Sequence, residues 1–285
     1  MNEISVTQNF LTNSQLIKDL INCTDISSED IVIDIGAGKG ILSRELAKVC
    51  KKVISVEYDG ALYEELKKNL NSVGNIELKN ESILEMSLPE SNYKVFSNIP
   101  FNITSRIINK LILGKSRPES AYLVVQKEAA QRFMGEGEGY LVSTLIKPYY
   151  YLRIIHEFQP TDFNPSPGVD VVMLAMTKRP EPLIKDQDRE LYDDFVAYVC
   201  IQQKPSLKVR LNKLFTYEQF KHLYKNGGFS HDITIKNLDI NVWISLFSSF
   251  KKYVPENKKS LVKGSYAKYK RTLEKAPLGS RTKIR

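Results

Sequence analysis

Short runs of strand-like residues alternate with amphipathic stretches over the first two thirds of the chain. Runs of strand length, rich in β-branched residues, occur at residues 31–35, 53–57, 75–79, 94–97, 121–125, 152–158 and 169–176. Stretches with apolar side chains at helical spacing lie between them, at residues 41–49, 62–70 and 103–113. Strands that alternate with helices predict a mostly parallel sheet covered on both faces. We therefore expect an α/β domain in residues 1–180.

The pattern changes after residue 180. Pro180, Pro182 and the charged run 185–190 have the composition of a linker. The next apolar residues recur at helical spacing, at residues 191–201, 208–214, 217–224 and 238–250. We expect a small helical domain in residues 181–250, followed by a basic segment in residues 251–285.

The positive charge is concentrated in this last segment. The chain carries a net charge of +8, but residues 251–285 alone hold twelve Lys or Arg against two Glu, so the remainder is slightly acidic. A basic segment with interleaved tyrosines favours RNA binding through phosphate neutralisation, and a solvated segment that aids solubility is the alternative. The candidate RNA-binding residues of this segment are Lys268, Lys270 and Arg271. In the helical domain Lys208, Arg210 and Lys213 follow near-helical spacing, which fits a phosphate-binding face or a solvated one.

Several classes of protein are excluded by composition. No run of about 18 apolar residues is present, and the N-terminus lacks a basic region followed by an apolar one, so we expect neither a membrane span nor a secretory signal. Cys23, Cys50 and Cys200 follow no metal-ligand spacing and form no disulfide framework. We expect a cytoplasmic protein without a bound metal.

A glycine-rich turn follows the first strand. Asp34 precedes Gly36 and Gly38 in a G-x-G-x-G spacing, which differs from the dinucleotide fingerprint and from a P-loop. Glycines allow close approach of a ligand to the backbone, and an acidic residue at the end of the next strand, Glu57, suits ribose hydroxyls. Together they predict a site for S-adenosylmethionine (SAM), although each feature alone also fits an ordinary turn or strand end.

The fourth run ends in Asn98-Ile99-Pro100-Phe101. The Asn98 side chain and the backbone carbonyl near Ile99 offer acceptors to a flat amine, Pro100 fixes the backbone and Phe101 offers a stacking face. An amine whose lone pair is shared with a ring becomes a better nucleophile when acceptors draw on its N–H groups. This sequence therefore predicts a pocket for an aromatic amine, with a simple strand end as the alternative.

These motifs resemble a known family when they are taken in order. Thr7–Leu11, Asp34–Gly40, Glu57, Asn98–Phe101 and Phe163–Pro167 follow the order found in rRNA adenine N6-methyltransferases. The chain resembles most the Erm enzymes, which confer resistance to macrolides, lincosamides and streptogramin B. The resemblance implies a Rossmann-like sheet with an antiparallel last strand, and a monomeric, SAM-dependent enzyme that methylates one adenine of 23S rRNA.

The resemblance also implies roles for individual residues. The cofactor would lie along Gln8, Asn9 and Leu11 at its methionine end, Gly36 and Gly38 in the turn, Glu57 at its ribose, and Ser82 and Ile83 at its adenine. Asn98 would also contact the cofactor. Asn98 and Ile99 would hold the target N6, and Phe101 and Phe163 would sandwich the target base. Ser82 departs from the family, which mostly has Asp there, and Phe101 replaces a frequent Tyr.

Two other functions fit the same motifs. One is a KsgA-type dimethylase of 16S rRNA, which residues 126–130 resemble as much as they resemble the Erm enzymes. The other is a non-catalytic RNA-binding relative that keeps the fold, for which the intact glycine turn and Asn98 pocket are unexpected. Ile99, Phe101 and the basic C-terminal segment favour the Erm branch.

Overall fold

The computed structural model describes residues 9–136, 140–227 and 233–274, which form two compact units. The first unit comprises residues up to 130 together with 151–178, and the second comprises 131–150 together with the residues from 179 onwards. The expected boundary at 180 lies close to the division between residues 178 and 179. It does not account for residues 131–150, which the structure groups with the helical unit.

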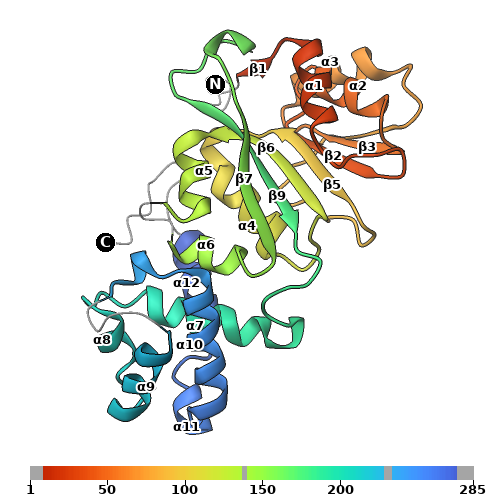
Figure 1. Cartoon of the computed structure of the whole chain (residues 1–285). Coiled ribbons are helices and arrows are strands. Elements are labelled where there is room, and N and C mark those ends of the chain that lie inside the picture. Colours follow the sequence, from red (N-terminus) through yellow and green to blue (C-terminus); the bar gives the residue numbers. More distant parts are fainter. Residues whose placement is uncertain (1–8, 137–139, 228–232, 275–285) are drawn as a thin grey trace. The chain divides into compact units, whose positions relative to one another are not determined.

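The first unit alternates strands and helices along the chain (Figure 1). Its elements are β1 (Phe10–Leu11), α1 (Ser14–Asn22), β2 (Ile31–Ile35), α2 (Ile41–Ala47), β3 (Lys52–Val56), α3 (Gly60–Leu70), β4 (Ile76–Lys79), β5 (Lys94–Asn98), the 3₁₀ turn η2 (Phe101–Ile103), α4 (Thr104–Leu113), β6 (Ser120–Gln126), α5 (Lys127–Met134), β7 (Tyr150–Glu157), η3 (Pro160–Asp162), β8 (Phe163–Asn164) and β9 (Val171–Lys178). The unit boundaries fall within α5 and at the start of β7.

The large sheet has the strand order β4-β3-β2-β5-β6-β9-β7. Strands β4, β3, β2, β5 and β6 run parallel, and β9 pairs antiparallel with β6. The expected mostly parallel sheet with an antiparallel strand is thus confirmed. Because the strands β2 to β5 are parallel, their carboxyl ends meet at one edge, where ligands bind in open α/β sheets.

Both faces of the sheet are buried, as the continuous apolar runs predict. One face packs against α1, α2 and the aromatic residues near β8, through residues that include Ile17, Leu46, Val32, Val53, Phe96, Val124 and Met173. The residues that alternate with these in the strands are also buried, and they include Ile33, Ile54, Val95, Leu123 and Leu174. Burial on both faces removes the polar alternation that a one-sided sheet would show.

Helix α1 was not expected from the sequence, although its signals are present. Asn13 caps it by accepting the N–H groups of Gln15 and Leu16 at 2.9 and 3.1 Å. Ile17, Leu20 and Ile21 are buried on one side, which is the spacing of an amphipathic helix.

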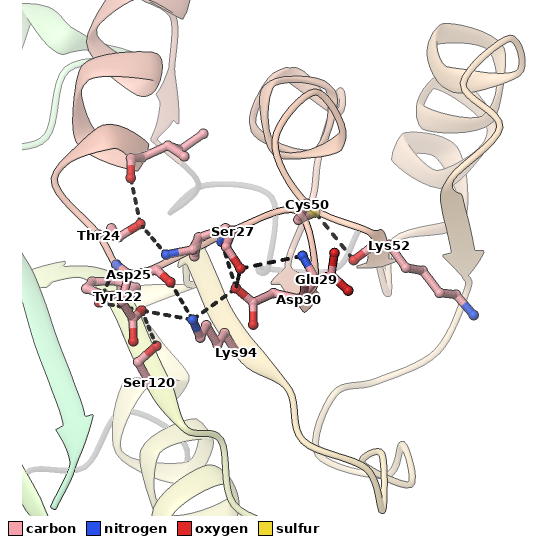
Figure 2. A network of polar contacts seen from close by, with 12 residues as sticks. Thr24, Asp25, Ser27, Glu29, Asp30, Cys50, Lys52, Lys94, Ser120 and Tyr122 are labelled. Carbon is pink, nitrogen blue, oxygen red and sulfur yellow. Dashed lines mark hydrogen bonds and ion pairs between the residues drawn. The ribbon is translucent and has the colours of Figure 1, made fainter.

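A polar network closes the opposite edge of the sheet, where β2, β5 and β6 begin (Figure 2). The Lys94 ammonium donates to the backbone carbonyl of Asp25 and, at 2.9 Å, to the Asp30 carboxylate. Ser120 and Tyr122 both donate to Asp25 Oδ1 at 2.8 Å. The hydrogen bond and charge of Lys94 and the bonds from Ser27 outweigh burial, so the pKa of Asp30 is lowered. This network attaches the loop after α1 to three strand starts, which fixes the amino edge of the sheet.

The second unit is helical. Its elements are α6 (Tyr140–Ile146), the 3₁₀ turn η4 (Asp186–Asp188), α7 (Arg189–Cys200), α8 (Leu207–Leu211), α9 (Tyr217–Gly227), η5 (Ile235–Asn237), α10 (Ile240–Tyr253), α11 (Glu256–Lys259) and α12 (Ser265–Glu274). Aromatic rings form its core, with Phe195 of α7 stacked on Phe250 of α10 at 4.8 Å. Residues 140–150 belong here because the Tyr192 hydroxyl donates to the Thr144 carbonyl at 3.0 Å and the Arg189 guanidinium lies 4.0 Å from the Tyr149 ring centroid.

The basic segment is built into this unit as far as it is described, up to residue 274. Val254, Val262 and Tyr269 are buried. The Asp194 carboxylate of α7 accepts the N–H groups of Gly264 at 2.7 Å and Tyr266 at 2.9 Å, which caps α12. Residues 251–274 are therefore a helical part of the unit, which corrects the expectation of a separate basic tail over this stretch.

Among the described residues, the longest apolar helices fall short of what is needed to cross a bilayer.

Candidate active site

The glycine turn after β2 has a backbone that other residues rarely adopt. Gly36, Gly38 and Gly40 have φ angles of +69°, +54° and +85°. A Cβ added to Gly38 would lie 2.4 Å from Cε1 of Phe10, so the ring of the N-terminal strand β1 packs directly on this turn. The absence of side chains thus leaves the turn open to a neighbouring ring and to a ligand.

Glu57 follows β3 and holds the turn in place. Its side chain is 2% exposed. Oε2 accepts the N–H of Gly38 at 2.9 Å, and Oε1 accepts the N–H of Asp59 at 2.9 Å. Each carboxylate oxygen retains a second acceptor position. Glu57 therefore braces the glycine turn and still has acceptor capacity for a hydroxyl group.

Asp34 lies buried beneath the turn. The Ser43 hydroxyl donates to Asp34 Oδ2 at 2.6 Å, and the Ser55 hydroxyl donates in turn to Ser43 at 2.7 Å. Burial raises the pKa of Asp34 to about 7, against the opposing effect of the Ser43 hydrogen bond and with a further contribution from the Glu57 charge. This carboxyl group bonds to Ser43 of α2 and does not line the pocket described next.

A pocket opens where β5 ends, beside the glycine turn. Its lining consists of Asn9, Phe10, Gly36, Asn98, Ile99, Pro100 and Phe101. Asn98 Nδ2 donates to the backbone carbonyl of Asn9 at 2.6 Å. This bond uses the amide nitrogen, so the acceptor Oδ1 is left for the pocket. The structure thus brings the predicted amine-binding residues and the glycine turn into one site.

The two predicted aromatic residues differ in their positions. Phe101 begins η2, is half-buried and lines the pocket. Phe163 is 5% exposed and packs edge-on against Phe158, with ring centroids 5.3 Å apart. It pairs with Leu11, which is also in the core, and neither belongs to the pocket lining. A stacking role for Phe163 stays a prediction that requires its ring to leave the core.

Phe10 is the pocket residue that the sequence reasoning did not select. Its neighbours Gln8, Asn9 and Leu11 are predicted cofactor-binding residues. The motif Thr7–Leu11, which contains all four, is the signal that could have identified Phe10. Gln8 lies outside the described residues. Of the three others, Asn9 and Phe10 reach the pocket.

The turn that contains Ser82 and Ile83 follows β4 at the same sheet edge. Ser82 Oγ accepts the N–H of Leu84 at 3.3 Å, and Ile83 is buried. The side chain of Asn80 donates to the backbone carbonyl of Glu57 at 2.9 Å, which ties this turn to the end of β3. Ser82 therefore has a local capping role that an Asp would fill with a charged acceptor.

The predicted RNA-binding residues belong to the second unit. Lys213, Lys268, Lys270 and Arg271 are exposed and Lys208 is half-buried. Arg210 is 9% exposed, and its Nη1 donates to the carbonyls of Val199 at 2.8 Å and Cys200 at 3.2 Å. Its guanidinium caps the C-terminus of α7 inside the unit, so a phosphate contact by Arg210 stays a prediction that requires the guanidinium to leave these carbonyls.

Groups of three or more His, Cys, Asp or Glu that would hold a metal ion do not occur in the part of the chain that the structure describes. The residues that line the pocket offer hydrogen-bond acceptors, an aromatic face and a glycine turn.

Comparison with known proteins agrees with this arrangement. The model of the family described as ribosomal RNA adenine dimethylase matches residues 1–252. An rRNA adenine N-6-methyltransferase of Lysinibacillus sphaericus is 30% identical over 254 residues, which cover 88% of this chain and 98% of that protein. A ribosomal RNA small subunit methyltransferase A of Clostridium botulinum is 32% identical over 230 residues, covering 78% and 84%.

The fold also matches solved structures. The crystal structure of the 23S rRNA methyltransferase ErmE aligns with a TM-score of 0.76 at 23% identity, covering 85% of this chain and all of that one. The family match, the parallel sheet and the pocket at its carboxyl edge agree with one another. The chain belongs to the ribosomal RNA adenine dimethylase family and is an rRNA adenine N6-methyltransferase.

Proposed function

We propose that this enzyme methylates N6 of one adenine in 23S rRNA at the macrolide-binding region and thereby confers resistance to macrolides, lincosamides and streptogramin B. The observation that carries the proposal is the pocket in which Asn98, anchored on Asn9, lies beside the glycine turn. We further propose that it acts as a monomer in the cytoplasm.

The residues at the carboxyl edge fit SAM as the cofactor. A side chain at Gly38 would collide with Phe10, and Gly36 lines the pocket, so the glycines keep this turn clear of side chains of its own. In this proposal Gly36 and Gly38 would contact the cofactor, Glu57 would accept hydrogen bonds from its ribose hydroxyls, and Ser82 and Ile83 would border its adenine. As the family resemblance implies, Gln8, Asn9 and Leu11 would hold its methionine end. When bound, SAM supplies an electrophilic methyl group on a sulfonium.

The target adenine is held by groups that draw on its amine. Asn98 Oδ1 and the Ile99 carbonyl accept the N6 hydrogens, which favours the tetrahedral nitrogen that develops as the methyl group is transferred. Phe101 offers a stacking face that offsets part of the cost of removing the base from its stack. A base within the protein is not required, because the proton of the methylated amine can pass to water.

The choice between 23S and 16S rRNA depends on individual residues and segments of the chain. Ile99 and Phe101 in the pocket and the basic C-terminal segment favour the Erm branch. The relative from Clostridium botulinum, whose name refers to the small subunit, and the resemblance of residues 126–130 favour the alternative, a KsgA-type dimethylase of 16S rRNA.

Expression in a macrolide-sensitive bacterium tests the proposal. We expect erythromycin resistance and a primer-extension stop at one adenine of 23S rRNA, both of which disappear with Asn98→Ala. A stop in 16S rRNA without resistance would establish the alternative. The absence of any modified adenine would contradict both.

A further inference from the structure

Two tyrosines of the second unit present their rings to solvent. Tyr217, at the start of α9, is 61% exposed, and Tyr253, at the end of α10, is 54% exposed. Large aromatic side chains usually bury most of their surface, and exposed rings are a common feature of binding sites. Neither ring is needed for the core of the unit, which Phe195, Trp243 and Phe250 fill.

Each exposed ring is accompanied by a lysine. Lys208 Nζ lies 5.2 Å from the Tyr217 ring centroid, and Lys252 Nζ lies 5.1 Å from that of Tyr253. Lys221 is exposed one helical turn after Tyr217. These five residues, Lys208, Tyr217, Lys221, Lys252 and Tyr253, are called the tyrosine–lysine surface below.

The two tyrosines belong to one region because α9 and α10 are tied together there. Gln219 Nε2, in the first turn of α9, donates to the backbone carbonyl of Tyr253 at 3.2 Å. The acidic residues nearby leave the positive charge in excess. Glu218 is exposed in the first turn of α9, and Glu256 is paired with Lys259 at 2.8 Å.

We propose that the tyrosine–lysine surface binds a single-stranded segment of the RNA substrate, with bases stacked on Tyr217 and Tyr253 and phosphates neutralised by the three lysines. The inference rests on the proposed function in that it takes RNA as the substrate. Alternating rings and cations suit a strand whose bases are free, because every base has a face to stack and every nucleotide has a phosphate. A duplex hides its base faces, and an acidic peptide has none, so neither uses the rings.

The lysines over the rings do not block this binding. An exposed lysine is held to an aromatic ring only weakly, whereas stacking of a base on the ring is stronger. A base can therefore displace the ammonium group, which then remains close enough to neutralise a phosphate.

Fluorescence anisotropy with the full chain in the absence of methyl donor tests the proposal. The probes are an unstructured RNA of about 12 nucleotides and a duplex RNA of the same length. The double variant Tyr217→Ala/Tyr253→Ala should bind the single strand at least about thirtyfold more weakly, with an unchanged salt slope and little change on the duplex. The matched variant Tyr217→Phe/Tyr253→Phe should bind like the wild type, and Tyr151→Ala, at another exposed tyrosine, should have no effect.

Replacement of the lysines should change the salt dependence of binding. Lys208→Gln/Lys252→Gln should flatten the dependence of log K on log salt by about 1.4, since each cation contributes about 0.7 on a single strand. Unchanged affinity of the alanine double variant, an equal loss on both probes, or competition by a polyglutamate peptide as effective as that by RNA would overturn the proposal. Because no methyl transfer is measured, a failure here is distinct from failure to modify 23S rRNA.

Discussion

The side-chain amide of Asn98 donates to the backbone carbonyl of Asn9 across 2.6 Å, although 89 residues separate them in the chain. This bond connects the end of β5 to the N-terminal segment. It fixes which end of the Asn98 amide faces the pocket, because the nitrogen is already used. The N-terminal segment thereby orients the acceptor that we assign to the target amine.

Removal of this acceptor should stop methyl transfer without preventing cofactor binding. We expect Asn98→Ala to lower kcat by about two to three orders of magnitude, the loss typical of a group that stabilises developing charge. The dissociation constant for SAM should change little, because most of the assigned cofactor contacts come from other residues. Single-turnover methylation of an rRNA fragment and calorimetry measure the two quantities. An unchanged rate would remove Asn98 from the mechanism.

The glycine turn should not tolerate even a methyl group at Gly38. Gly38→Ala places a Cβ 2.4 Å from the Phe10 ring, at a φ of +54°. We expect a loss of about 1–3 kcal/mol in the free energy of unfolding and weaker cofactor binding. Gly60→Ala is the matched control, since its Cβ would meet nothing within 4 Å. Equal effects of the two substitutions in urea titrations would contradict a special role for this turn.

Replacement of Ser82 by the Asp that the family usually carries should strengthen ligand binding. Ser82→Asp replaces the hydroxyl that accepts from Leu84 with a charged acceptor, and such hydrogen bonds are stronger. We expect tighter binding of the cofactor product S-adenosylhomocysteine, and weaker binding for Ser82→Ala. Calorimetry distinguishes these results, and identical affinities for all three proteins would show that the turn does not contact the ligand.

The buried Asp34 should make stability dependent on pH. Its pKa of about 7 in the folded state lies above the ordinary value of 3.8, so the folded protein binds the extra proton. The stability that the protonated Asp34 contributes is therefore fully present at about pH 4 and is lost as the pH rises through 7. The Asp34→Asn variant lacks this titrating group. Its free energy of unfolding should therefore exceed that of the wild type above pH 7, by up to about 4 kcal/mol. Urea unfolding at several pH values tests this, and parallel pH profiles would argue against it.

The C-terminal helix should depend on Asp194. Asp194→Ala leaves the N–H groups of Gly264 and Tyr266 without their acceptor, which should lower the free energy of unfolding by about 2 kcal/mol. Glu181→Ala, at an exposed acid, should have little effect. A chain that ends at residue 274 should keep its stability, whereas one that ends at 250 loses the buried Val262 and should not. Equal stability of the two truncated chains would show that α12 does not support the unit.

Local patterns in the sequence were sufficient for the sheet and for the centre of the site. The apolar runs of β2, β3, β5 and β6 are recognisable because burial on both faces requires continuous apolar residues. Gly36, Glu57 and Asn98 could be selected as candidates because each directly follows or ends such a run, and parallel strands bring their carboxyl ends together. Gly38 lies two residues after Gly36 in the same turn.

The remaining features depend on contacts between residues far apart in the chain. Strand β1 has only two residues, so it shows no periodicity from which it could be predicted. Its pairing with β8 places Phe10 on Gly38 and Phe163 in the core. A cation in the sequence gives no sign of its surroundings, and Arg210 is buried because the carbonyls at the end of α7 lie beside it. Sequence alone thus located strands β2 to β6 to within one residue at each end, whereas tertiary packing decided which side chains face the pocket, since only packing sets their partners.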